Sequence, residues 1–127
     1  MSKKILFVDD DEMTLQVGKF MLEALGYNVV TAESGKAALD ILKKYKAHLI
    51  FLDVMMPDIN GIDVLQALKA DKKLKSIPVV LQTGVGNQNE INEMMKLGAT
   101  SIIRKPYNKD KLLEIIKLTL QNSTEDL

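Results

Sequence analysis

Four short runs of apolar residues mark the chain, at positions 5–8, 49–52, 79–81 and 102–103. Within each run the apolar residues do not alternate with polar ones. This pattern is typical of strands that are covered on both faces, as in a parallel sheet packed between helices. Residues 28–32 form a weaker run and predict a fifth strand.

Segments with helical spacing of apolar residues lie between these runs. The first helix is predicted to begin at Asp11 and Glu12, because acids suit a helix N-terminus. Asn87 and Glu90 resemble a capping box that opens the fourth helix, and the last helix is predicted over about 108–120. For the first helix, the residues expected to face the core are Met13, Val17, Phe20, Met21, Ala24 and Leu25.

Strand and helix therefore follow each other five times along the chain. Every connection is long enough to hold a helix, so all strands can run parallel with right-handed crossovers. The predicted fold class is α/β, a doubly wound three-layer domain with a five-stranded parallel sheet and five helices. Ligands of such folds bind at the carboxyl ends of the strands.

Polar side chains with distinct chemistry stand at these predicted strand ends. Asp9 and Asp10 follow the first strand, Asp53 the third, Thr83 the fourth and Lys105 the fifth. Each of them alone is most simply a turn residue, a helix cap or a surface lysine. Their occurrence at four separate strand ends predicts a site instead.

Three carboxylates close together repel one another unless cations balance them or one pKa rises. A divalent ion together with Lys105 would neutralise Asp9, Asp10 and Asp53. Oxygen ligands without histidine or cysteine favour Mg²⁺, with Mn²⁺ as a possible substitute, over zinc. Such an ion beside an amine and a hydroxyl is suited to handling a phosphoryl group.

Composition narrows the class of protein. The 127 residues fit one domain, and 17 basic residues balance 17 acidic ones, which argues against direct nucleic-acid binding. The absence of cysteine excludes disulfides and thiolate sites. No apolar run is long enough to span or insert into a membrane, and the N-terminus does not resemble a signal peptide. We expect a cytoplasmic protein.

In combination these motifs resemble the receiver domain of two-component response regulators. The resemblance covers residues 5 to about 120. The motifs are Val8-Asp9-Asp10-Asp11, Leu52-Asp53-Val54-Met55-Met56-Pro57 followed by Gly61, Thr83-Gly84, and Lys105-Pro106. It implies a flavodoxin-like sheet with strand order 2-1-3-4-5, and one receiver domain over residues 1–127 with its core at about 4–121.

The resemblance also implies the role of each acid. Asp53 would accept a phosphoryl group from a phosphohistidine on a partner protein, and would hold Mg²⁺ together with Asp10. The backbone carbonyl of Met55 would be the third protein ligand, and Asp9 would bind the ion through a water. Such a protein is a signalling module, and it catalyses only its own phosphorylation and dephosphorylation.

Other implied roles concern the response to phosphorylation. Lys105 would neutralise one phosphate oxygen and Thr83 would donate to another, while Lys105-Pro106 is commonly a cis peptide in this family. The surface of the fourth helix, fifth strand and fifth helix would then change. Ile102 stands where the family often has an aromatic switch residue, so backbone and aliphatic repacking, or else Tyr107, would have to report activation. For Tyr107, plain packing is the simpler interpretation.

The implied partners are a histidine kinase or histidine phosphotransfer protein and a downstream effector protein. The main alternative is a haloacid-dehalogenase-like Mg²⁺-dependent phosphatase with Asp9 as nucleophile. Its motif, Asp-x-Asp-x-Thr/Val, is imperfect because Met13 takes the last place and Thr14 falls one position late. A flavin-binding protein is disfavoured because no Gly/Ser/Thr-rich phosphate loop follows the first strand. The sequence names neither the kinase nor the effector, and leaves open the phosphoryl lifetime, the oligomeric state and whether the chain acts alone or was part of a longer protein.

Overall fold

The computed structural model describes residues 3–56, 59–84 and 88–121, with strands and helices alternating throughout. The strands are β1 Lys4–Val8, β2 Asn28–Ala32, β3 Leu49–Asp53, β4 Val79–Thr83 and β5 Ser101–Arg104. The helices are α1 Glu12–Ala24, α2 Gly35–Leu42, α3 Gly61–Ala70, α4 Gln88–Lys96 and α5 Lys109–Gln121. The weakly predicted strand at 28–32 is thus confirmed as β2.

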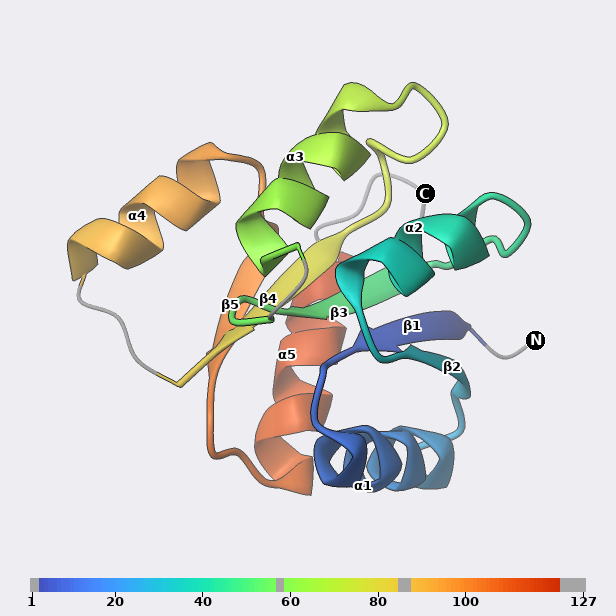
Figure 1. The fold of residues 1–127 in the computed structure, drawn as a ribbon. Coiled ribbons are helices and arrows are strands. Elements are labelled where there is room, and N and C mark those ends of the chain that lie inside the picture. Colours follow the sequence, from blue (N-terminus) through green and yellow to red (C-terminus); the bar gives the residue numbers. More distant parts are fainter. Residues whose placement is uncertain (1–2, 57–58, 85–87, 122–127) are drawn as a thin grey trace.

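The five strands form one parallel sheet in the order β2-β1-β3-β4-β5, as predicted. Helices α1 and α5 cover one face of this sheet, and α2, α3 and α4 cover the other (Figure 1). Strand order reverses between β1 and β3, so the carboxyl ends of these two neighbours flank the place where doubly wound folds bind ligands.

A hydrophobic core fills each side of the sheet. On the α1/α5 side, the rings of Phe7 and Phe51 stack with their centroids 5.7 Å apart, and Leu22, Val80 and Ile116 pack around them. The core on the other side is built on alternate residues of the same strands. Both faces of the strands are buried, which explains why their apolar residues form unbroken runs.

One prediction about α1 is wrong. Met13, Val17 and Phe20 were expected to face the core, but their side chains are 66%, 47% and 75% exposed. The residues that α1 buries are Leu15, Gly18 and Leu22, whereas only part of the expected set, such as Met21, packs half-buried against the core. The helix carries two apolar stripes with similar spacing, and only one of them can face the sheet.

Gly18 explains which stripe faces inward. A Cβ at this position would lie 2.5 Å from the ring of Phe7, so the backbone of α1 rests directly on that aromatic side chain. Only glycine permits this close approach. With Gly18 against Phe7, Leu15 and Leu22 turn toward the sheet and Phe20 turns to solvent.

Capping residues set the helix starts. Asp11, Ser34 and Asn60 are N-caps whose side chains accept hydrogen bonds from the backbone three residues later. The expected role of Asp11 at the start of α1 is therefore confirmed. Asn87 of the predicted capping box lies outside the described residues, as does Pro57.

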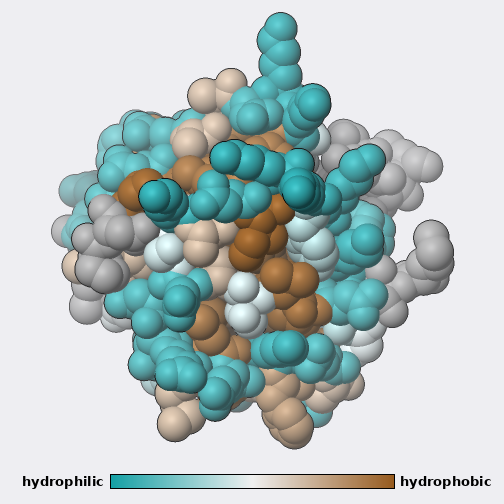
Figure 2. All heavy atoms as spheres, turned by 45° about the vertical axis from the view of Figure 1, so that its right-hand side comes forward, coloured by the Kyte–Doolittle hydropathy of each residue, from teal (hydrophilic) through white to brown (hydrophobic). Residues whose placement is uncertain are grey.

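Hydrophilic side chains cover much of the surface in Figure 2, which brings the right-hand side of Figure 1 forward by a 45° turn. A hydrophobic patch lies near the centre of this view and is surrounded by hydrophilic side chains. Within the residues that the structure describes, no helix has the length and apolar character to cross a bilayer.

Candidate functional site

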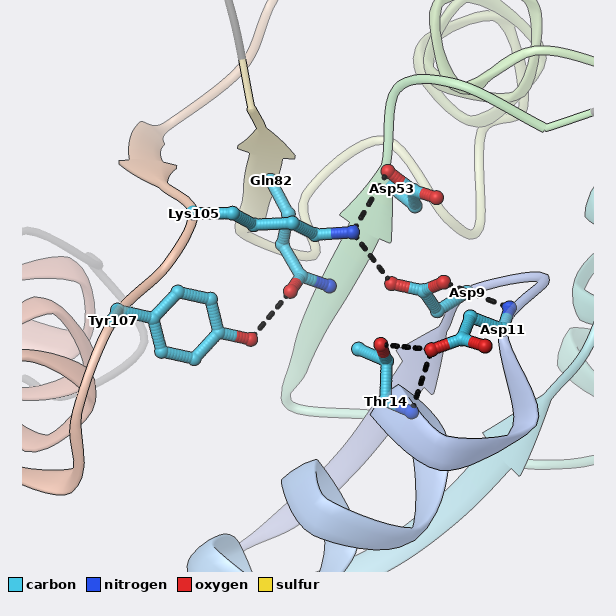
Figure 3. Close-up of polar contacts among 7 residues, drawn as sticks. All are labelled: Asp9, Asp11, Thr14, Asp53, Gln82, Lys105 and Tyr107. Atoms are coloured by element: carbon cyan, nitrogen blue, oxygen red, sulfur yellow. Dashed lines mark hydrogen bonds and ion pairs between the residues drawn. The ribbon is translucent and has the colours of Figure 1, made fainter.

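The parallel sheet brings the predicted site residues to one edge. Asp53 and Thr83 are the last residues of β3 and β4, and Asp9 directly follows β1. Lys105 follows β5, and its backbone N–H donates to the Thr83 carbonyl at 2.8 Å. Figure 3 shows the amine of Lys105 pointing between the carboxylates of Asp9 and Asp53. The expectation that the side chains of Asp9, Asp53 and Lys105 meet is confirmed.

Three acids form a compact cluster there. Asp9, Asp10 and Asp53 each place a carboxylate oxygen within 4.8 Å of the others. Asp9 and Asp53 are buried, with 1% and 5% of their surface exposed, whereas Asp10 is open to solvent. Hard divalent cations such as Mg²⁺ prefer sets of carboxylate oxygens that leave room for water. The donor atoms fit such an ion.

Lys105 supplies positive charge inside this cluster. Its Nζ lies 2.9 Å from Oδ2 of Asp9 and 3.4 Å from Oδ1 of Asp53. Burial alone would lower the pKa of the Lys105 amine, but the hydrogen bond to Asp9 and the charges of both acids outweigh burial and raise that pKa. The amine is therefore protonated, and it balances one of the two buried carboxylates.

The acidity of Asp53 is strongly altered by its surroundings. Burial raises its pKa to about 6, and the negative charge of Asp9 adds to the rise. Lys105 and a backbone hydrogen bond from Met55 oppose the rise without cancelling it. One amine thus does not fully balance the buried acids, and a divalent cation would lower the pKa of Asp53 and leave its oxygen able to act as a nucleophile.

Local hydrogen bonds hold the acid cluster in place. Oδ1 of Asp9 accepts from the backbone N–H of Asp11 at 3.0 Å, which leaves Oδ2 for Lys105. Asp11 itself bonds to the hydroxyl and backbone N–H of Thr14, and these bonds lower its pKa. Asp11 is therefore committed to capping α1, and it is not part of the acid cluster.

The loop after Asp53 packs closely against the strand. The Gly61 N–H donates to the Val54 carbonyl at 2.9 Å, and a Cβ on Gly61 would collide with the carbonyl oxygen of Asp53. This position therefore requires glycine, because the start of α3 lies directly on the phosphoacceptor candidate. The side chain of Met55 is 72% exposed beside it.

The structure adds one contact that the sequence did not predict, a hydrogen bond between Gln82 and Tyr107. Gln82, next to the end of β4, is fully buried, and its Oε1 accepts a hydrogen bond from the hydroxyl of Tyr107 (Figure 3). The available signal was a glutamine directly after the apolar run 79–81. The Lys105–Pro106 peptide, which lies between β5 and α5, is cis, as the family resemblance implied.

Comparisons with known proteins agree with this geometry. The family model described as "Response regulator receiver domain" matches residues 5–117. The polar-differentiation response regulator DivK of Brucella ovis is 30% identical over 117 residues, which cover 92% of this chain and 95% of DivK. These matches support a receiver domain and give no support to the haloacid-dehalogenase-like alternative.

Solved structures show the same fold. The chemotaxis protein CheY4 of Vibrio cholerae superposes with a TM-score of 0.90 at 30% identity, over 94% of this chain and all of CheY4. A CheY-like receiver domain protein of Methanospirillum hungatei gives a TM-score of 0.89 at 31% identity, with both chains covered completely. Sequence and structure comparisons therefore point to the same family.

Proposed function

This chain belongs to the family of response regulator receiver domains, and on that premise we propose that Asp53 is the residue that accepts the phosphoryl group. The observation that carries this assignment is the meeting of Asp53 with Asp9, Asp10 and the amine of Lys105 at one edge of the sheet. Phosphoryl transfer is catalysed chiefly by positioning and by charge stabilisation, and this edge supplies both. We further propose that residues 1–127 act as one receiver domain with its core at about 4–121.

In the proposed reaction, a carboxylate oxygen of Asp53 attacks the phosphorus of a phosphohistidine in line. The O–P bond of an acyl phosphate forms as the P–N bond breaks, and the bonding electron pair returns to the imidazole nitrogen. Lys105 would balance the charge of a phosphate oxygen. Thr83, buried at the end of β4, would donate its hydroxyl to another oxygen.

Asp10 and Asp53 would hold Mg²⁺ directly, with the Met55 carbonyl as the third protein ligand and Asp9 contributing through a water. Bound there, the ion supplies Lewis-acid stabilisation of the transferred phosphoryl group, and Mn²⁺ could replace it. Support comes from the oxygen-only donor set of the cluster and from the raised pKa of Asp53. The donor set suits a hard cation, and the raised pKa indicates that Lys105 alone balances the negative charge here incompletely.

The output surface would be the face formed by α4, β5 and α5. An open hollow on this face is lined by Ile91, Ile102, Tyr107 and Lys111, among others. Ile102 is half-buried there, so its response to phosphorylation would be aliphatic repacking. This face would control a downstream effector protein, and no nucleic acid or membrane would be bound directly.

The phosphodonor would be a histidine kinase or a histidine phosphotransfer protein that approaches over α1. A second hollow, lined by Met13, Val17 and Lys105, leads from the exposed stripe of α1 to the site. A partner helix with an apolar face could therefore cover this stripe while its phosphohistidine reaches Asp53. As a signalling module, the chain would catalyse only its own phosphorylation and dephosphorylation, and we propose that it does so in the cytoplasm.

The assignment is tested with a small phosphodonor. The protein is incubated with acetyl phosphate and Mg²⁺, and the modified residue is located by mass spectrometry after borohydride trapping. We expect modification of Asp53, loss of it in Asp53→Asn, and loss in the presence of EDTA. The matched control is Asp40→Asn, an exposed acid on α2. Modification of another residue, or undiminished labelling of Asp53→Asn, would overturn the assignment.

A further inference from the structure

Gln82 occupies an unusual place for a polar side chain. It lies in β4, fully buried, and pairs in the sheet with Asp53 on β3. Its backbone carbonyl accepts a hydrogen bond at 3.1 Å from Val54, the residue directly after Asp53. The backbone of Gln82 is thus part of the wall that supports the phosphoacceptor candidate.

The side chain of Gln82 reaches the other flank of the site. Its Oε1 accepts from the hydroxyl of Tyr107, which lies two residues after Lys105 (Figure 3). One residue therefore contacts the loop after Asp53 through its backbone and the segment 105–107 through its side chain. The first of these segments follows Asp53, the phosphoacceptor candidate, and the second carries the amine of Lys105 that pairs with Asp53.

This arrangement has an energetic cost. Among the described residues, Nε2 of Gln82 is one of two buried side-chain polar atoms without a hydrogen-bond partner. A buried donor left unsatisfied destabilises the folded state, and an aliphatic side chain at this position would avoid that cost. Packing alone therefore does not account for a glutamine at position 82, whereas a requirement to hold Tyr107 does.

Tyr107 is well placed to transmit this restraint. Its ring lines both hollows, the one beside α1 and the one on the α4-β5-α5 face, and its side chain packs against the α1/α5 core. Burial raises the pKa of its hydroxyl, and the charges of Asp9 and Asp53 raise it further, so this group stays protonated as a donor. The hydroxyl accordingly fixes one end of the segment whose other end carries Lys105.

We propose that Gln82 is a positioning residue: by holding the hydroxyl of Tyr107 it fixes segment 105–107, so that the amine of Lys105 faces Asp9 and Asp53. Its contribution to phosphoryl transfer rests on the function proposed for Asp53. Its effect on the placement of Lys105 does not, because the ion pairs of the amine exist without any phosphoryl group.

The test removes the hydrogen bond from either end. Gln82→Met keeps side-chain length without the acceptor, and Tyr107→Phe removes only the hydroxyl. Thr119→Val is the matched control, because the buried Thr119 hydroxyl bonds to Ser101 on β5 in a separate contact between β5 and α5. The primary measurement is the ¹⁵Nζ chemical shift of Lys105. An amine held between two carboxylates should resonate apart from the amines of exposed lysines, and the difference between the two shifts is the quantity followed.

We expect this difference in chemical shift to fall by about half or more in Gln82→Met and in Tyr107→Phe. The double variant should show no larger decrease than either single variant, because both substitutions remove the same hydrogen bond. The rate of acetyl phosphate labelling should fall about three- to tenfold in parallel, since a misplaced Lys105 stabilises less charge. Thr119→Val should change neither measurement.

A Lys105 resonance that stays at its wild-type position in both single variants would overturn the proposal. The proposal would also be overturned if the shift changes of the two single variants added up in the double variant. If acetyl phosphate fails to label Asp53 in the wild type, the proposed function fails, while the Lys105 resonance still decides the role of Gln82.

Discussion

The amine of Lys105 lies 2.9 Å from a carboxylate oxygen of Asp9, a residue 96 positions earlier in the chain. The two residues follow β5 and β1, which have β3 and β4 between them in the sheet. Neighbouring strands lie about 4.8 Å apart, so the backbones of β1 and β5 are separated by roughly 14 Å. The long side chain of Lys105 and the side chain of Asp9 reach toward each other across this gap, and the hydrogen bond between them closes it (Figure 3).

Lys105→Met should separate metal binding from phosphorylation. The variant keeps the length of the side chain but removes the charge, so Asp9 and Asp53 lose the amine that competes with a cation for their oxygens. We expect Mg²⁺ to bind at least as tightly as to the wild type. Labelling by acetyl phosphate should fall by about a hundredfold, because a charge that stabilises the transition state is missing.

Calorimetric titration with Mg²⁺ and the rate of mass-detected labelling measure these two effects. Lys43→Met is the matched control, because Lys43 is an exposed lysine paired with Asp40 far from the site. Weaker Mg²⁺ binding in Lys105→Met, or labelling at the wild-type rate, would contradict the role given to this amine.

Replacement of Asp53 should stabilise the metal-free protein near neutral pH. Its pKa of about 6 lies above the value of about 3.9 expected in the unfolded chain. The folded state therefore binds the proton more tightly, and this stabilisation is complete below about pH 4 and is lost as the pH rises through about 6. At pH 7.5, Asp53→Asn should raise the free energy of unfolding by about 2 kcal/mol.

Urea unfolding in EDTA at pH 7.5 and pH 5 measures this difference. The advantage of Asp53→Asn should shrink at pH 5, where the wild-type carboxyl is mostly protonated in the folded state. Asp40→Asn serves as the control, because this acid is exposed on α2. An advantage that is equal at the two pH values would show that the charge of Asp53 is not its cause.

Close packing at Gly61 gives a prediction about the loop that follows Asp53. In Gly61→Ala the added methyl group meets the Asp53 carbonyl and the backbone of Val54, so α3 must shift away from the strand. Such overpacking costs about 1–3 kcal/mol. We expect the free energy of unfolding to fall by that amount, together with the rate of acetyl phosphate labelling.

Gly84→Ala is the matched control at the neighbouring strand end. A Cβ at Gly84 meets no atom of the residues that the structure describes within 4 Å, so the variant should unfold within about 0.5 kcal/mol of the wild type. Equal stability of the two alanine variants in urea titrations would show that the start of α3 tolerates a side chain at residue 61.

The sequence could predict the sheet and the acid cluster because both depend on the order of elements. Unbroken apolar runs such as 49–52 identify buried parallel strands, and parallel strands bring Asp9 and Asp53 to the same edge. Lys105 comes to this edge as well, because β5 is a parallel strand of the same sheet. None of this requires knowledge of how individual side chains pack.

Side-chain packing was less predictable. The exposed stripe with Val17 and Phe20 and the buried stripe with Leu15 and Leu22 have nearly the same helical spacing, so periodicity does not separate them. The contact between Gly18 and the Phe7 ring decides between the stripes, and it is a long-range contact that spacing does not encode. The bond from Tyr107 to Gln82 is long-range in the same way.

The two stripes of α1 should therefore differ in their contribution to stability. Phe20→Gln replaces a side chain that is 75% exposed, and it should change the free energy of unfolding by no more than about 0.5 kcal/mol. Leu22→Ala empties a fully buried position, and it should cost about 2–5 kcal/mol. Urea unfolding of both variants measures the contrast. A large loss in Phe20→Gln with a small loss in Leu22→Ala would mean that α1 is rotated in solution, with Met13, Val17 and Phe20 facing the sheet after all.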